Sequence, residues 1–287
     1  MLKRPGFLLL FALTVSACSP LALLNLTISG EGYQRNADLV YGELPRQKLD
    51  VYTPDDAASA AVVIFFYGGG WEDGDRGDYR FVAQALADNG LVTVIPDYRL
   101  YPQVKFPGFL EDSALAVKWV KQNIARFGGD SRRIFLMGHS AGAYNAAMLA
   151  IDERYLAAVG VDPREIDGFI GLAGPYDFLP LTSANLKAVF GPSSGLARTQ
   201  PVDFVSGDEA PMLLLNGAND TRVDPRNSSS LAARVRQCGG EVKHVVYPDL
   251  SHTRIVGAIA SPFRDWAPVL DEVVEFIRAH SGPKGQE

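Results

Sequence analysis

Three side chains far apart in the sequence are of the types needed to activate a serine for nucleophilic attack. Ser140 lies in the middle of the run GHSAG, a G-x-S-x-G pattern. A serine hydroxyl is a poor nucleophile unless a base removes its proton and a third group orients that base. We predict that His252 is the base and that Asp220 orients it. The chemistry expected of these residues is transfer of an acyl group to water.

Other residues fit these roles less well. His139 adjoins the serine and should point elsewhere, His244 falls within a predicted strand, and His280 falls near the end of the last predicted helix. Asp224 is the alternative to Asp220, although the Pro225 that follows it favours a turn. The triad prediction therefore rests on Asp220 and His252, each in a loop that directly follows a predicted strand.

Glycines surround the proposed nucleophile in the sequence. A glycine on either side of the bend lets a strand and a helix pass closely, so the serine is exposed at a tight turn. A second group, Gly68-Gly69-Gly70, ends an apolar strand. These glycines and the backbone N–H of Ala141 are expected to bind the negative oxygen that forms during acyl transfer. Trp71, next in the sequence, is either a wall of the acyl pocket or a core residue.

The elements that must position these residues alternate along the chain. Apolar runs predict buried strands, and helical periodicity predicts the helices between them. The expected strands are residues 40–42, 48–52, 61–67, 91–96, 135–137, 166–172, 211–217 and 241–247. The expected helices are residues 81–89, 109–127, a helix after the Ser140 turn that includes 146–150, 231–237 and 265–280. After an antiparallel start, this alternation predicts an α/β doubly wound, mostly parallel sheet with helices on both faces, and residues 176–207 form a cap over the site.

The motifs resemble those of the α/β-hydrolase carboxylesterases, among them the hormone-sensitive-lipase-like enzymes and the kynurenine formamidase and prenylcysteine methylesterase groups. The resemblance rests on residues 67–71 (YGGGW), 97–100 (DYRL) and 138–142 (GHSAG), together with Asp220 and His252. It implies an α/β-hydrolase fold over roughly residues 45–280, and an oxyanion hole formed by Gly69, Gly70 and Ala141. The family's usual residue before the glycines is His, and here it is Tyr67.

The resemblance implies an esterase that needs no cofactor and acts on a small-molecule ester. An arylformamidase and a carbohydrate deacetylase use the same machinery and remain alternatives. A non-catalytic binding protein of this fold would normally have lost a member of the triad. The sequence has neither a C-x-x-C nor an H-E-x-x-H motif, so it predicts no metal site.

The first residues have the features of an export signal. A basic start is followed by an apolar run at residues 6–15 and by small residues before Cys18. Residues 15–18 resemble a bacterial lipoprotein box, and Ser19 favours sorting to the outer membrane. We therefore expect a signal peptide over residues 1–17, a lipid on Cys18, a linker over 18–36, and one α/β-hydrolase domain over 37–287 in the periplasm. The alternative is a plain secretory signal cut nearby.

The charge of the chain argues against nucleic acid as a partner. The formal net charge is −6, and removal of residues 1–17 takes away Lys3 and Arg4 and no acid, which makes it −8. Nucleic-acid binding needs a basic surface. The two cysteines, Cys18 and Cys238, could not form a disulfide if Cys18 carried a lipid.

Overall fold

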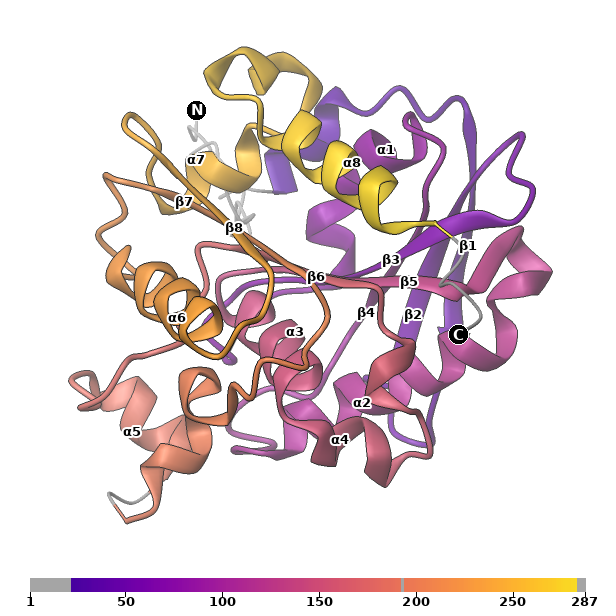
Figure 1. Ribbon diagram of the computed structural model, residues 1–287. Coiled ribbons are helices and arrows are strands. Elements are labelled where there is room, and N and C mark those ends of the chain that lie inside the picture. Colours follow the sequence, from indigo (N-terminus) through magenta and orange to yellow (C-terminus); the bar gives the residue numbers. More distant parts are fainter. Residues whose placement is uncertain (1–21, 192–193, 283–287) are drawn as a thin grey trace, which may run out of the picture.

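An eight-stranded sheet crosses the middle of the molecule (Figure 1). The computed structural model describes residues 22–191 and 194–282, and the counts below refer to these residues. The strands are β1 Tyr33–Val40, β2 Lys48–Pro54, β3 Ala60–Phe66, β4 Val92–Pro96, β5 Gly129–His139, β6 Gly168–Leu172, β7 Met212–Gly217 and β8 Val242–Tyr247. Their order across the sheet is β1-β2-β4-β3-β5-β6-β7-β8.

The direction of the strands follows the predicted pattern. β1 pairs antiparallel with β2, and β2 pairs antiparallel with β4. All neighbouring pairs from β4 to β8 are parallel. The central strands β3, β6 and β7 are almost wholly buried because helices cover both faces of a parallel sheet. The prediction of a mostly parallel α/β sheet is confirmed.

Helices lie on both faces of this sheet, as predicted. The α-helices are α1 Arg80–Ala87, α2 Gly108–Asn123, α3 Ala141–Ile151, α4 Glu153–Ala158, α5 Ala184–Phe190, α6 Arg226–Gln237, α7 His252–Gly257 and α8 Val269–His280. Figure 1 shows α1 and α8 on one face and α2, α3 and α6 on the other. Helix α5 lies apart from the sheet in Figure 1 and forms part of the predicted cap.

The predicted linker over residues 18–36 is wrong at its carboxyl end. Strand β1 begins at Tyr33, where the linker was expected to continue, and a short 3₁₀ helix, η1 (Ala22–Thr27), packs on the domain. Asn25 of η1 donates a side-chain hydrogen bond to the carbonyl of Gly77 and accepts one from the backbone N–H of Phe81. Strand β1 escaped detection because it is an edge strand with mostly exposed, polar side chains, which leave no apolar pattern.

Two helices differ from their predicted bounds for local reasons. Helix α6 begins at Arg226, before the predicted start at Leu231, because its first turns are polar and lack apolar periodicity. The predicted last helix over residues 265–280 is two elements, the 3₁₀ helix η7 (Ser261–Trp266) and α8. Pro268 precedes α8, where its missing N–H is harmless.

Several predictions concern residues outside those described. The signal peptide and Cys18 lie in this part of the chain, so the expectations about export and lipidation stay predictions. Among the described residues, no helix has both the length and the apolar character needed to cross a membrane. The same residues hold no group of three or more side chains arranged to bind a metal ion.

Candidate active site

Ser140 lies at a sharp bend between β5 and α3. Its backbone has φ +55° and ψ −123°, an uncommon conformation for a residue with a side chain. The bend requires the two glycines of the motif. A Cβ on Gly138 would lie 2.3 Å from the carbonyl oxygen of Gly142, and a Cβ on Gly142 would lie 2.0 Å from that of Phe66. The motif therefore forms a strained turn that presents the serine at the end of its strand.

The structure brings Ser140, His252 and Asp220 together in one hydrogen-bonded line. The Oγ of Ser140 is 2.8 Å from Nε2 of His252, and Nδ1 of His252 is 2.7 Å from Oδ2 of Asp220. The three residues follow β5, β8 and β7, so they meet at the carboxyl edge of the parallel strands. This is where ligands bind in open α/β sheets.

The surroundings of Asp220 favour its charged form. Its second oxygen accepts hydrogen bonds from the backbone N–H groups of Arg222 and Val223, each 2.9 Å long. Burial alone would raise the pKa of Asp220, but the hydrogen bonds from His252 and from these two N–H groups outweigh it and hold the pKa below its ordinary value. A charged carboxylate is what the orienting role requires.

The alternative acid and two of the alternative bases lie outside the hydrogen-bonded triad. Asp224 is exposed and accepts a bond from the N–H of Arg226, so it stabilises a turn. His244 contacts Asn216, and His280 bonds to the Phe276 carbonyl and to Glu241.

The glycine loop between β3 and the 3₁₀ helix η2 (Arg76–Tyr79) runs directly past the serine. A Cβ on Gly68 would lie 3.0 Å from Cβ of Ser140. Gly69 has φ +138° and Gly70 has φ +63°, conformations that favour glycine. In the hydrogen bonds among the described residues, the backbone N–H groups of Gly69, Gly70 and Ala141 donate to no acceptor. The loop and the first residue of α3 therefore offer free donors next to the serine hydroxyl.

Trp71 is a core residue rather than an open wall of a pocket. It is 3% exposed, and its ring meets the edges of Tyr144 and Phe190 at centroid distances of 5.3 and 4.9 Å. Its indole N–H donates to Oδ1 of Asn145, 3.0 Å away. Asn145 thus anchors the glycine loop to α3. Sequence reasoning missed this residue, and the available signal was a single Asn within a helix of small and apolar residues.

Tyr67, which replaces the family's usual His, is held by its own set of contacts. The ring stacks on Tyr98 at 4.7 Å, and the Tyr98 hydroxyl donates to the Tyr67 carbonyl at 2.7 Å. Arg46 donates to the Tyr67 hydroxyl, to the Tyr98 carbonyl and to the Gly74 carbonyl. Arg46 and two tyrosines therefore hold both ends of the glycine loop, and Tyr98 belongs to the DYRL segment, residues 97–100.

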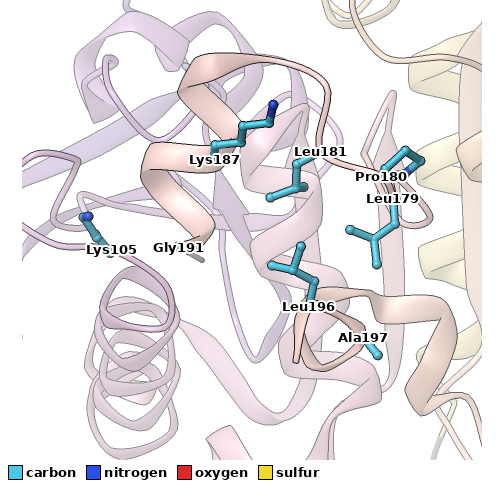
Figure 2. A pocket seen from close by; sticks show the side chains of 8 residues that line it. All are labelled: Lys105, Leu179, Pro180, Leu181, Lys187, Gly191, Leu196 and Ala197. Atoms are coloured by element: carbon cyan, nitrogen blue, oxygen red, sulfur yellow. The ribbon is translucent and has the colours of Figure 1, made fainter. Parts of the chain in front are cut away.

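The segment between β6 and β7 forms the cap and carries a pocket. Asn185 on α5 donates to the carboxylate of Glu72 in the glycine loop, so the cap is tied to the predicted oxyanion site. A pocket of about 840 Å³ opens beside α5, and the side chains of Leu181 and Leu196 face each other across it (Figure 2). It is lined by Lys105, Leu179, Pro180, Leu181, Lys187, Gly191, Leu196 and Ala197. Neither Ser140 nor His252 lines this pocket.

Known proteins with similar sequences are esterases by name. A probable isoprenylcysteine alpha-carbonyl methylesterase of Arabidopsis thaliana is 28% identical over 268 residues, which cover 83% of this chain and 54% of that protein. The probable carboxylic ester hydrolase LipM of Mycobacterium tuberculosis is 29% identical over 262 residues, covering 84% of this chain and 60% of that protein. The chain thus spans a little over half the length of these relatives.

Known structures share the fold at low sequence identity. A truncated carbohydrate esterase from gut microbiota superposes with a TM-score of 0.76 at 18% identity, covering 88% of this chain and 98% of that one. The carboxylesterase EstE1, cloned from a metagenomic library, has a TM-score of 0.75 at 20% identity, covering 92% and 94%. These matches confirm the α/β-hydrolase fold.

The sequence model of one family, BD-FAE, matches residues 49–235, well over half of the chain. The protein therefore belongs to the BD-FAE family.

Proposed function

We propose that this protein is a serine carboxylesterase that hydrolyses esters of small or medium acyl groups through an acyl-enzyme. The observation that carries the proposal is the line of hydrogen bonds from Asp220 through His252 to Ser140. The esterase names of the relatives from Arabidopsis thaliana and Mycobacterium tuberculosis support the same class of reaction.

The geometry supports a two-step reaction. Ser140 attacks the ester carbonyl while Nε2 of His252, 2.8 Å from the hydroxyl, takes its proton. His252 then gives this proton to the departing alcohol, which leaves an acyl group on the serine. In the second step His252 activates a water molecule that releases the acid. Asp220 holds the imidazole with its proton on Nδ1 and stabilises the charged form.

The negative oxygen of each tetrahedral intermediate is bound by backbone groups. The N–H groups of Gly69, Gly70 and Ala141 are the proposed donors, since none of them donates to an acceptor among the described residues. Each such donor is typically responsible for a factor of about 10²–10³ in rate.

The cap favours short or medium acyl groups. Its inner side is filled by aromatic rings, with Phe178 and Phe190 5.2 Å apart and each against the edge of Tyr144. Tightly packed rings leave little room for a long hydrocarbon chain in this part of the cap. The pocket beside α5 is lined by neither Ser140 nor His252.

The test is hydrolysis of p-nitrophenyl acetate and butyrate by the wild type and by Ser140→Ala. We expect the substitution to lower kcat by about 10⁴-fold or more and to abolish labelling by a fluorophosphonate probe. Ser229→Ala, which changes an exposed serine on α6, is the matched control and should label normally. Equal hydrolysis by the wild type and Ser140→Ala would refute the proposal, and an unlabelled wild type would indicate a non-catalytic binding protein.

A substrate screen separates the esterase from the alternatives that share its machinery. Acetyl, butyryl and feruloyl esters, acetylated sugars and a formyl amide are compared by kcat/KM. The proposal expects the simple acyl esters to give the highest values. A preference for the formyl amide would identify an arylformamidase, and a preference for acetylated sugars would identify a carbohydrate deacetylase.

We also propose that the protein is exported and held at the outer membrane by a lipid on Cys18. The support is the signal-like sequence of residues 1–18. In addition, η1 follows a few residues later and exposes Leu23 and Leu26, at 55% and 83%. The test is metabolic labelling with radioactive palmitate in a bacterial host. Label on the wild type and none on Cys18→Ser is expected, and label on both would contradict the proposal.

A further inference from the structure

A chain of buried hydrogen bonds connects the glycine loop to the proposed base. The backbone N–H of Gly68 donates to the hydroxyl of Tyr79 at 3.3 Å. This hydroxyl lies 3.0 Å from Nδ1 of His139, and Nε2 of His139 lies 2.9 Å from the carbonyl oxygen of His252. His139 and His252 also pack ring against ring, with centroids 4.9 Å apart. The chain uses side chains that the triad and the oxyanion site do not use.

The donor and acceptor properties of these groups determine which atom carries the proton in each of these hydrogen bonds. The carbonyl oxygen of His252 can only accept, so Nε2 of His139 carries a proton. Burial, and then the nearby His252, lower the pKa of His139 to about 3, so the ring is neutral and Nδ1 is an acceptor. The hydroxyl of Tyr79 therefore donates to Nδ1, and its oxygen accepts from Gly68. Every hydrogen bond in this series is thus donated in the same direction, from Gly68 toward His252.

Each part that the chain joins is a part of the proposed site. Gly68 immediately precedes the oxyanion glycines, His139 immediately precedes Ser140, and His252 is the base. Gly68 follows β3, His139 is the last residue of β5, and His252 follows β8. The contact between His139 and His252 alone joins residues 113 positions apart. Tyr79 lies at the end of η2, buried among Phe65, Tyr67 and Phe81, so its ring cannot swing away from the chain.

We propose that Tyr79 and His139 are positioning residues that hold the oxyanion loop and the base in register with Ser140. This inference rests on the proposed esterase function. The hydrogen bond from His139 to the backbone carbonyl of His252 fixes the position of the His252 imidazole relative to the Ser140 hydroxyl. The hydrogen bond to Gly68 sets the position of the oxyanion donors. Displacements of about 1 Å in a catalytic group can cost about 10²-fold in rate.

The first test is Tyr79→Phe, which removes one hydroxyl and keeps the ring. We expect kcat for p-nitrophenyl acetate to fall about tenfold or more, with KM within about twofold, because the substrate still binds but meets a misaligned site. Tyr41→Phe is the matched control, since it also removes a buried hydroxyl, but one that donates to the Asp97 carbonyl and makes no hydrogen bond to Gly68 or His139. It should lower the melting temperature without lowering kcat. An equal kcat in the two variants would overturn the proposal.

A second pair of variants covers the case in which Tyr79→Phe fails to fold. His139→Gln keeps an amide donor and acceptor and should retain most of the wild-type kcat, whereas His139→Leu keeps the bulk alone and should lose about tenfold or more. Rescue by Gln is not expected if residue 139 only fills space. A folded His139→Leu with wild-type kcat would overturn the proposal.

A third measurement needs no activity, so it separates this inference from the esterase proposal. Nitrogen NMR of the wild type, assigned with His139→Gln, reports which ring nitrogen of His139 carries the proton. We expect the proton on Nε2, unchanged between pH 5 and pH 8. A proton on Nδ1 would overturn the positioning chain. If the tautomer is as expected but the protein hydrolyses no ester, the esterase proposal fails and so does the catalytic role of the chain.

Discussion

The buried, neutral His139 should make the stability of the folded protein depend on pH below neutrality. Its pKa is about 3 in the folded protein, lowered first by burial and second by His252, whereas an unfolded histidine titrates near its ordinary value of about 6.5. As the pH falls, the unfolded chain therefore takes up a proton that the folded chain does not. Stability from this group is complete above about pH 6.5 and is lost progressively down to about pH 3.

The size of the effect follows from these two pKa values. Each pH unit between them changes the free energy of unfolding by about 1.4 kcal/mol. From pH 7 to pH 5 the loss due to His139 is about 2 kcal/mol. Burial, and then Arg236, also lower the pKa of His244, which adds a loss of the same sign. His139→Gln isolates the effect of one residue because it removes the titrating group and leaves His244 in place.

The assay is urea unfolding of the wild type and His139→Gln at both pH values, followed by tryptophan fluorescence. The wild type should lose about 2 kcal/mol more than the variant between pH 7 and pH 5. Above pH 7, protonation of His139 should no longer change the free energy of unfolding of the wild type. If the two proteins lost the same free energy, residue 139 would not be a neutral buried histidine, and the proton placement argued for the positioning chain would be wrong.

Three further substitutions test the loop, the triad and the framework. Gly69→Ala should lower kcat by about 10²–10³-fold, because its φ is +138° and the added Cβ would lie 1.9 Å from the Asp73 carbonyl oxygen. Asp220→Asn should lower kcat by about 10³–10⁴-fold in the p-nitrophenyl acetate assay, since the imidazole loses its orienting charge. Asp112→Asn should destabilise the fold by about 3 kcal/mol, because Asp112 is buried against Arg99 at 2.7 Å; an unchanged melting temperature would contradict this.

Each catalytic substitution has a neighbouring control. Gly70→Ala should cost less activity than Gly69→Ala, because its nearest atom would be Nδ2 of Asn185 at 3.7 Å. Asp224→Asn should leave kcat unchanged, whereas Asp220→Asn should not, because Asp224 is exposed and caps a turn. Equal losses within either pair would count against the site as described.

Features that depend on local pattern were readable from the sequence. The apolar runs that form β3, β4 and β7 belong to strands buried on both faces, and such strands have few polar residues. The glycines beside Ser140 indicated the bend because only glycine fits where two backbones nearly touch. Asp220 and His252 could be chosen because each follows a strand, and the carboxyl ends of parallel strands lie at one edge of the sheet.

The tertiary structure alone decided which distant groups touch. Strand β1 has no apolar pattern, so only its pairing with β2 reveals it. The sequence is equally compatible with Trp71 as a pocket wall and as a core residue. Its hydrogen bond to Asn145 and its ring contact with Phe190 identify it as a core residue. The contacts of Tyr79 and His139 join residues 60 and 113 positions apart. Periodicity reports which side of an element is buried, whereas the partner of a buried polar group depends on how the elements pack, and no local pattern carries that information.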